Sequence, residues 1–113
     1  MDITTGNTAG RDALRTYLGG GTAGDDSELQ AAWDTTVDAL QRFIRPGYTT
    51  DAPAGVLEYT LAVAATVWRL RDSSGEVTVL PDGTLSAPGS IQSAIYKYRA
   101  LGGPYVVTPR VIA

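Results

Sequence analysis

The sequence contains no cysteine and no histidine. Without cysteine the chain can form neither a disulfide nor a thiolate metal site, and without histidine it lacks the commonest general base and the usual zinc ligand. Lysine is scarce as well, because Lys97 is the single lysine among nine basic residues. We attribute this bias to a GC-rich genome. The net charge of -3 weighs against nucleic acid as the main partner, and the residue inventory disfavours an enzyme.

Long apolar runs are also missing from the chain. The longest run, residues 61–68, is far too short to span a bilayer, and the N-terminus lacks the basic and apolar regions of a signal peptide. We therefore expect a protein that is made in a cytoplasm and has no membrane partner. A length of 113 residues with 43% apolar composition suits one globular domain with one core.

The first half of the chain carries two helical patterns. Residues 1–10 are polar, and we expect them to be flexible; residues 10–18 then predict a short helix that is closed by Gly19. Beyond a capping-box-like pair at Asp25 and Glu28, apolar residues recur every three to four positions, as on one face of a helix. These residues are Leu29, Trp33, Val37, Leu40 and Ile44. This helix is predicted to end at Pro46-Gly47.

Two further helices are predicted in the second half. The segment after Asp51 and Pro53, which suit the start of a helix, is apolar nearly all round as far as residue 72. A helix that is apolar on every side is buried, so we place this one in the middle of the fold. The last helix is expected from Ser90 to about Leu101, before two glycines.

Two segments have strand-like patterns. Residues 76–87 alternate polar and apolar side chains around Pro81-Asp82-Gly83, which predicts a β-hairpin, and residues 104–113 predict an extended C-terminal arm. Neither segment has an obvious partner within the chain, and a lone hairpin is marginally stable in water. The sequence therefore predicts a mainly α protein. Its helical bundle, with three main helices plus a short N-terminal one, occupies residues 11–103 and carries the hairpin and the arm.

The remaining polar motifs receive structural interpretations. Residues 19–24 match G-x-G-x-x-G, but they follow a helix, and Asp25 and Asp26 would repel a phosphate, so we interpret them as a linker. Asp34 and Asp38 lie one turn apart on the polar face of their helix, which favours a solvated face over a catalytic pair. We expect no catalytic residue, no metal site and no cofactor.

Two interpretations stay open at the end of the central helix. Trp68 can pack in the core or contact another subunit. Arg69 and Arg71 can stabilise the helix C-terminus through its dipole, or they can clamp a carboxylate or backbone group of a neighbouring subunit. Tyrosine and basic residues alternate in residues 95–107, which favours a protein interface.

The order of these parts resembles the head-to-tail connector, or adaptor, family of tailed bacteriophages over about residues 25–113. The resemblance is carried by VLEYTLAVAATVWRLRDSSG and IQSAIYKYRALGG. It implies a homo-oligomeric ring, dodecameric in the virion, that sits beneath the portal protein, extends the DNA channel and provides a platform for a stopper or tail protein. DNA would be only passing cargo. The ring would belong to the virion at the head-tail interface and assemble in the host bacterial cytoplasm, without a cofactor or a reaction.

The resemblance also assigns roles to residues. Portal docking through the C-terminal segment carries over to Tyr105, Val106, Val107, Arg110, Val111 and Ile112. Contacts of the hairpin with neighbouring subunits carry over to Val77, Val79, Leu80 and Leu85. In a ring, each unpaired strand could add to the edge of a neighbour. We thus expect a chain without residues 104–113 to stay a folded monomer that cannot join a portal ring.

Two other functions remain open. Another phage morphogenesis component, such as a stopper or tail-completion protein, is one alternative, although we expect a stopper to be mainly β. A small helical regulator that binds protein or nucleic acid is the other, and binding to DNA would show a strong dependence on salt.

Overall fold

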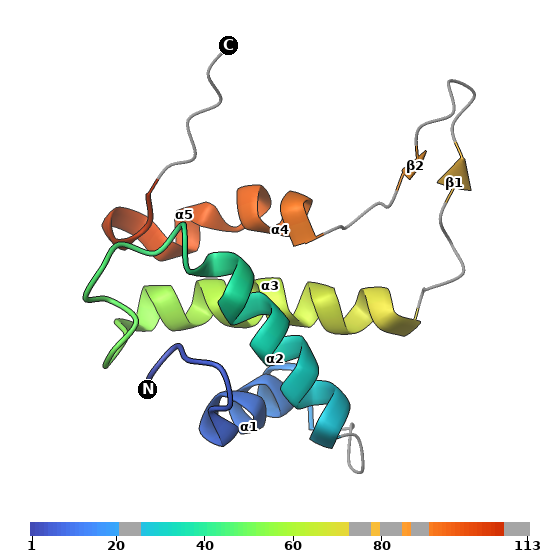
Figure 1. Ribbon diagram of the computed structural model, residues 1–113, viewed down its shortest axis with the longest axis horizontal. Coiled ribbons are helices and arrows are strands. Elements are labelled where there is room, and N and C mark those ends of the chain that lie inside the picture. The colour runs from blue at the N-terminus through green and yellow to red at the C-terminus, as the bar shows by residue number, and fades with distance from the viewer. Residues whose placement is uncertain (21–25, 73–77, 80–84, 87–90, 108–113) are drawn as a thin grey trace.

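A computed structural model describes residues 1–20, 26–72, 78–79, 85–86 and 91–107. Its elements, in chain order, are α1 (Thr8–Tyr17), α2 (Asp26–Leu40), α3 (Ala54–Asp72), β1 (Thr78–Val79), β2 (Leu85–Ser86), α4 (Ile91–Lys97), α5 (Arg99–Gly102) and the 3-10 helix η1 (Gly103–Tyr105). Figure 1 shows α4 and α5 on one side of α3 and α1 on the other, while α2 crosses α3. The predicted fold class, a small mainly α bundle, is confirmed.

Helix α3 is the centre of the bundle, as its pattern predicted. It packs against α1, α2, α4, α5 and η1, and its buried residues face every one of these directions. Gly55 shows how close the packing is, because a Cβ atom added there would lie 2.6 Å from the carbonyl oxygen of Leu101 in α5. A glycine at this position therefore lets the two backbones approach each other directly. No helix within the described ranges is long and apolar enough to cross a membrane.

The apolar stripe of α2 forms the other half of the core. Leu29, Trp33, Val37 and Leu40 are fully buried. The ring of Trp33 packs on Gly10 of α1, where an added Cβ atom would lie 2.2 Å from the indole. The indole N–H donates a hydrogen bond of 2.9 Å to the carbonyl oxygen of Thr4, so this large side chain buries its apolar surface and keeps its polar group satisfied.

Helix α1 ends as its glycines predicted. Gly19 and Gly20 have φ angles of 97° and 75°, in the left-handed region that glycine adopts without strain. The N–H of Gly19 donates to the carbonyl of Thr16 at 3.0 Å, and that of Gly20 donates to Arg15 at 2.9 Å. This pair of bonds is a Schellman motif, which satisfies the last carbonyl groups of the helix.

Helix α2 is shorter than predicted. It ends at Leu40, although the apolar stripe continues to Ile44 and we expected the helix to reach Pro46. The chain instead makes a turn, and Ile44 forms an isolated antiparallel bridge with Val106. Ile44 is still buried, but through pairing with the C-terminal segment rather than through the helix. Asp25, the predicted cap, lies outside the described residues.

The last helix is interrupted where one continuous helix was predicted. Helix α4 ends at Lys97, and α5 begins at Arg99. In a continuous helix the N–H of Arg99 would bond to the carbonyl of Ile95. That carbonyl accepts a hydrogen bond of 2.8 Å from the hydroxyl of Tyr59 in α3. The break therefore coincides with a tertiary contact at this carbonyl, which a local sequence pattern does not reveal.

The first ten residues are packed where we expected a flexible segment. Ile3 is fully buried, and its N–H donates a hydrogen bond of 2.7 Å to the carbonyl of Thr49. Helix α1 already begins at Thr8, with the side chain of Asn7 accepting from the N–H of Ala9 at its N-terminus. The difference arises because one buried side chain and distant backbone groups hold the segment.

Candidate functional site

The C-terminal segment, residues 103–107, is the first candidate interaction site, and its backbone pairs with residues 43–45. The N–H of Val107 donates to the carbonyl of Phe43 at 2.6 Å, and the N–H of Arg45 donates to the carbonyl of Tyr105 at 2.9 Å. The Arg45 guanidinium adds a bond of 3.1 Å from its Nε atom to the Pro104 carbonyl. The prediction that this segment has no partner within the chain is therefore wrong for residues 104–107.

Side chains reinforce this pairing. Val106 is only 6% exposed, and a Cβ atom added to Gly102 would lie 2.0 Å from its Cγ2 atom. The ring of Tyr105 packs at a tilt on that of Tyr48, with 4.8 Å between the centroids. Val107, in contrast, is 40% exposed. Of the six predicted portal contacts, Val106 is thus part of the core, Tyr105 is half-buried and Val107 is accessible. Arg110, Val111 and Ile112 lie outside the described residues.

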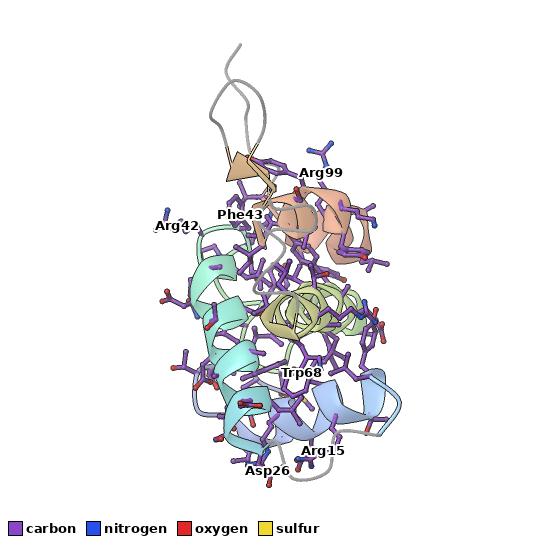
Figure 2. The ribbon with its side chains drawn as sticks, turned by 90° about the vertical axis from the view of Figure 1, so that its right-hand side faces the viewer. Arg15, Asp26, Arg42, Phe43, Trp68 and Arg99 are labelled. Atoms are coloured by element: carbon purple, nitrogen blue, oxygen red, sulfur yellow. The ribbon has the colours of Figure 1, made fainter. Side chains whose placement is uncertain are left out.

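The residues predicted at the end of the central helix separate into two environments. Trp68 is 7% exposed and belongs to the hydrophobic core, so the core-packing interpretation holds for it (Figure 2). Its side chain is inaccessible to another subunit in this conformation. Arg69 is exposed on the surface of α3. Arg71 also lies in α3, and its side chain is not among those that the structure describes.

The predicted hairpin is present as a short pair of antiparallel strands. Thr78 of β1 faces Ser86 of β2, and Val79 faces Leu85. Figure 1 shows the pair beyond the C-terminal end of α3, apart from the helices. Residues 80–84 between the strands, among them Leu80, and Val77 before β1 lie outside the described residues. The backbones of Val79 and Leu85 are therefore paired with each other in a single copy.

Tyr59 has a clear change in its ionisation. Its side chain is fully buried, and its hydroxyl donates to the carbonyl of Ile95. Burial raises the pKa of Tyr59 to about 12, while the positive charge of Arg99 acts in the opposite direction. The phenol is neutral at physiological pH and serves as a hydrogen-bond donor between α3 and α4.

We expect this phenol to make stability depend on pH in alkaline solution. Because the folded pKa is raised, the contribution of Tyr59 is complete below pH 10 and is lost as the pH rises toward 12. The loss in the free energy of unfolding amounts to about 2 kcal/mol between these limits. Urea denaturation of the wild type and of Tyr59→Phe at several pH values measures it. Equal slopes for the two proteins above pH 10 would contradict the assignment.

Residues 1–6 form a second candidate site, which we call the N-terminal strap. Its backbone bonds to the loop before α3, where the N–H of Ala52 donates to the Met1 carbonyl at 2.9 Å. The N–H of Asp51 donates to a carboxylate oxygen of Asp2 at 2.9 Å. Asp51 has a φ angle of 50°, which is uncommon for a residue other than glycine. Two successive N–H groups of this loop thus bond to the strap.

The strap also makes contacts with α2 that sequence reasoning missed. A carboxylate oxygen of Asp34 accepts from the N–H of Gly6 at 2.7 Å and from the side chain of Gln30 at 3.0 Å. Asp34 is half-exposed and Asp38 is exposed, as expected of a solvated face, but that interpretation missed the hydrogen bond by which the Asp34 carboxylate holds the strap. No signal in the local sequence links residues that are 28 positions apart.

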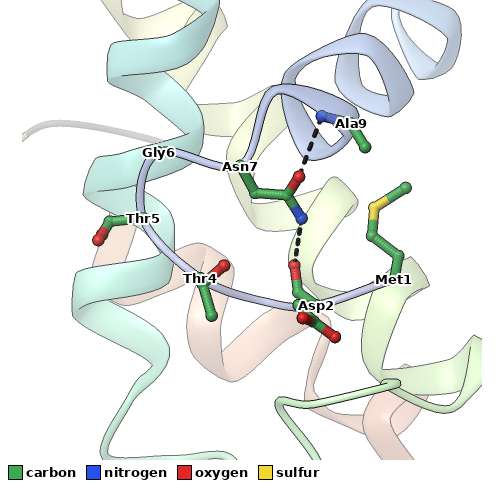
Figure 3. A pocket seen from close by; sticks show the side chains of 7 residues that line it. All are labelled: Met1, Asp2, Thr4, Thr5, Gly6, Asn7 and Ala9. Carbon is green, nitrogen blue, oxygen red and sulfur yellow. Dashed lines mark hydrogen bonds between the residues drawn. The ribbon is translucent and has the colours of Figure 1, made fainter.

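An open hollow of about 490 Å³ lies inside the curve of the strap (Figure 3). Asn7 crosses the curve, and its amide donates to the Asp2 carbonyl at 2.6 Å while its oxygen caps α1. A second, smaller hollow of about 240 Å³ beside the C-terminal segment is lined by Arg99, Ala100, Gly103 and Val106. The first lining includes the hydroxyls of Thr4 and Thr5 and the carboxylate of Asp2, and the hydrogen bond recorded for that carboxylate comes from the N–H of Asp51 rather than from a hydroxyl.

Charged side chains gather where α1 meets α2. The Arg15 guanidinium contacts a carboxylate oxygen of Asp26 at the start of α2, and it lies 3.3 Å from Asp12 in its own helix (Figure 2). These groups are partly exposed, and Arg15 near the end of α1 also complements the helix dipole. Among the described residues, no three acidic, histidine or cysteine side chains are placed to hold a metal ion.

Comparison with models of known families, with curated proteins and with solved structures finds no match for this chain. The geometry above therefore stands alone. It provides two surfaces built by backbone pairing, the C-terminal segment and the N-terminal strap, together with a pair of strands set apart from the helices.

Proposed function

We propose that this protein is a structural component of a tailed bacteriophage, a head-to-tail connector that forms a homo-oligomeric ring beneath the portal protein. In this role the ring extends the DNA channel and offers a platform to a stopper or tail protein. It performs no reaction and needs no cofactor, and DNA is passing cargo. The ring is dodecameric, belongs to the virion and assembles in the host cytoplasm.

The observation that carries the proposal is the strand pair between α3 and α4. Its register joins Val79 to Leu85, and Figure 1 shows it away from the helical body. A two-stranded hairpin gains little stability by itself in water, and the outer edge of each strand offers free backbone groups to another chain. Neighbouring copies in a ring supply such a chain, and a closed ring leaves no interface unused.

Two properties of the whole chain support the same proposal. The helical bundle, the inserted hairpin and the C-terminal segment follow one another in the order from which the family resemblance was drawn. The acidic composition, with a net charge of -3, suits a channel wall that repels phosphate groups and lets DNA slide. The mainly helical fold also weighs against the stopper alternative, which we expect to be mainly β.

The structure changes which C-terminal residues we propose as contacts with the portal protein. Since Val106 is buried in the single copy, portal docking falls to the exposed Val107 and to Arg110, Val111 and Ile112 beyond it. Arg69 is exposed on α3 and stays a candidate contact between subunits.

A shortened chain tests the proposal. We expect a protein without residues 108–113 to fold but to lose assembly on portal rings by at least about tenfold in affinity, a difference of roughly 1.4 kcal/mol. The portal protein for this test is the one that the proposal expects to be encoded upstream in the same genome. Negative-stain electron microscopy and sedimentation of the mixture measure assembly, and Arg11→Ala on the far side of the molecule serves as the control. Undiminished assembly of the shortened chain, or a genome without a portal gene, counts against the connector function.

A further inference from the structure

We propose that the N-terminal strap is an exchangeable segment, and that the seat which it occupies binds the same six residues of a second copy of this chain. The seat consists of groups on α2, on the loop before α3 and at the start of α1. They are the indole N–H of Trp33, the carboxylate of Asp34, the carbonyl of Thr49, the N–H groups of Asp51 and Ala52, and the amide of Asn7.

The strap binds its seat in the way that an extended peptide binds a protein groove. Five of its main-chain groups take part in hydrogen bonds to the seat: the Met1 carbonyl, the Asp2 carbonyl, the Ile3 N–H, the Thr4 carbonyl and the Gly6 N–H. One side chain, that of Ile3, is fully buried, while its neighbours Asp2 and Thr4 are exposed. Main-chain bonds combined with one anchoring side chain are the usual means of recognising an extended peptide.

The strap and the seat are separable parts of the molecule. Apart from Asn7, all residues of the seat lie between positions 33 and 52, far along the chain from the six residues of the strap. Gly6, with a φ angle of 77°, joins the strap to α1, and α1 has its own anchor where Gly10 meets Trp33. The strap can therefore leave while α1 stays in place, because the backbone turns at a glycine.

Exchange costs little once two copies are neighbours. The incoming strap makes the same bonds that the departing strap gives up, including the bond from Asn7 of the receiving copy to Asp2 of the incoming one. Six extended residues reach roughly 20 Å, so the two seats must belong to touching subunits. In dilute solution the seat binds the strap of its own chain rather than that of another copy, because the effective concentration of the tethered strap is high. In a monomer the strap thus occupies the seat of its own chain. In an assembly it occupies the seat of a neighbouring copy and links the two copies.

A peptide added to the full-length chain tests the proposal. In Ile3→Asp the seat should be vacated, since a carboxylate cannot replace the buried side chain. The chain has only two tryptophans, so the indole N–H signal of Trp33 is easily followed by NMR, with that of Trp68 as the internal reference. We expect the signal to shift in Ile3→Asp, and the peptide MDITTGN to restore it saturably.

Two controls define what supports or overturns the inference. A peptide with the same Ile3→Asp change should not restore the signal, and the wild-type chain should bind the wild-type peptide at least about 100-fold more weakly than the variant does, because its own strap competes. A folded variant that ignores the peptide overturns the proposal, as does equal binding by both chains. If Ile3→Asp does not fold, Ile3→Ala replaces it.

Hydrogen exchange of the wild-type chain gives an independent readout. The amides of Ile3, Gly6, Asp51 and Ala52 should exchange together and at least about tenfold faster than the amide of Val63 in the centre of α3, because the strap opens without global unfolding. If these four amides exchange only as fast as the core, the strap is not a separate unit and the proposal fails. This inference does not depend on the connector function, because the peptide test involves no portal protein.

Discussion

Gly10→Ala is expected to lower the free energy of unfolding by about 2–3 kcal/mol, although alanine normally stabilises a helix relative to glycine. The new methyl group would lie 2.2 Å from the ring of Trp33. That ring is fully buried and is held in place by its hydrogen bond to Thr4, so it cannot simply move aside. Helix α1 must shift away from α2, and the packing between them is lost. Urea denaturation followed by circular dichroism measures the change.

Two further variants isolate this contact. Ala9→Gly, at an exposed position next to Gly10, should cost only about 0.5–1 kcal/mol through helix propensity. Trp33→Phe removes ring atoms that the methyl group meets, so Gly10→Ala should cost less in that background than in the wild type. A Gly10→Ala protein that is as stable as the wild type would contradict the close approach of α1 to α2.

Removal of residues 104–113 is expected to lower the free energy of unfolding by about 3–7 kcal/mol. The shortened chain loses the burial of Val106, which contributes about 1.5–3 kcal/mol, and the hydrogen bonds that residues 104–107 share with Phe43 and Arg45, each worth about 0.5–1.5 kcal/mol. This is a large part of the total stability of a small domain. We therefore expect that shortened chain to be a strongly destabilised monomer, not the stably folded one that the sequence predicted.

The matched control is the chain that lacks only residues 108–113. Every bond of the C-terminal segment named above involves residue 107 or an earlier one, so this chain should stay within about 1 kcal/mol of the wild type. Urea denaturation of the two shortened chains distinguishes the role of residues 104–107 in folding from that of the last six residues in assembly. Equal losses in both would show that the pairing with residues 43–45 contributes little.

Local patterns predicted the helices because each pattern and its consequence lie within one element. The stripe from Leu29 to Leu40 is buried as its spacing indicated, and the all-round apolar composition of α3 placed it at the centre. The glycines at the end of α1 have the expected left-handed backbone. In these cases the residues that determine the structure are neighbours in the chain.

The sequence did not predict contacts between distant segments. Ile3 is a single apolar residue in a polar stretch, so no periodicity marks it as buried. Ile44 continues the apolar stripe of α2, yet it forms a strand bridge with Val106. The backbone next to Ile44 makes hydrogen bonds with the C-terminal segment, and a longer α2 helix would prevent these bonds. Such pairings depend on where the chain ends meet the core, and both candidate surfaces of the molecule are built from them.

The position of the tryptophans in the bundle has a practical consequence for spectroscopy. Trp33 lies in α2 and Trp68 in the central helix, whereas the aromatic residues of positions 91–107 are all tyrosines, namely Tyr96, Tyr98 and Tyr105. Intrinsic fluorescence excited at the red edge therefore comes from α2 and α3 and from no residue of positions 91–107. A ligand or subunit that binds only to α4, α5 or the C-terminal segment should change the indole emission little. Its binding must be followed through an added fluorophore or through tyrosine absorption.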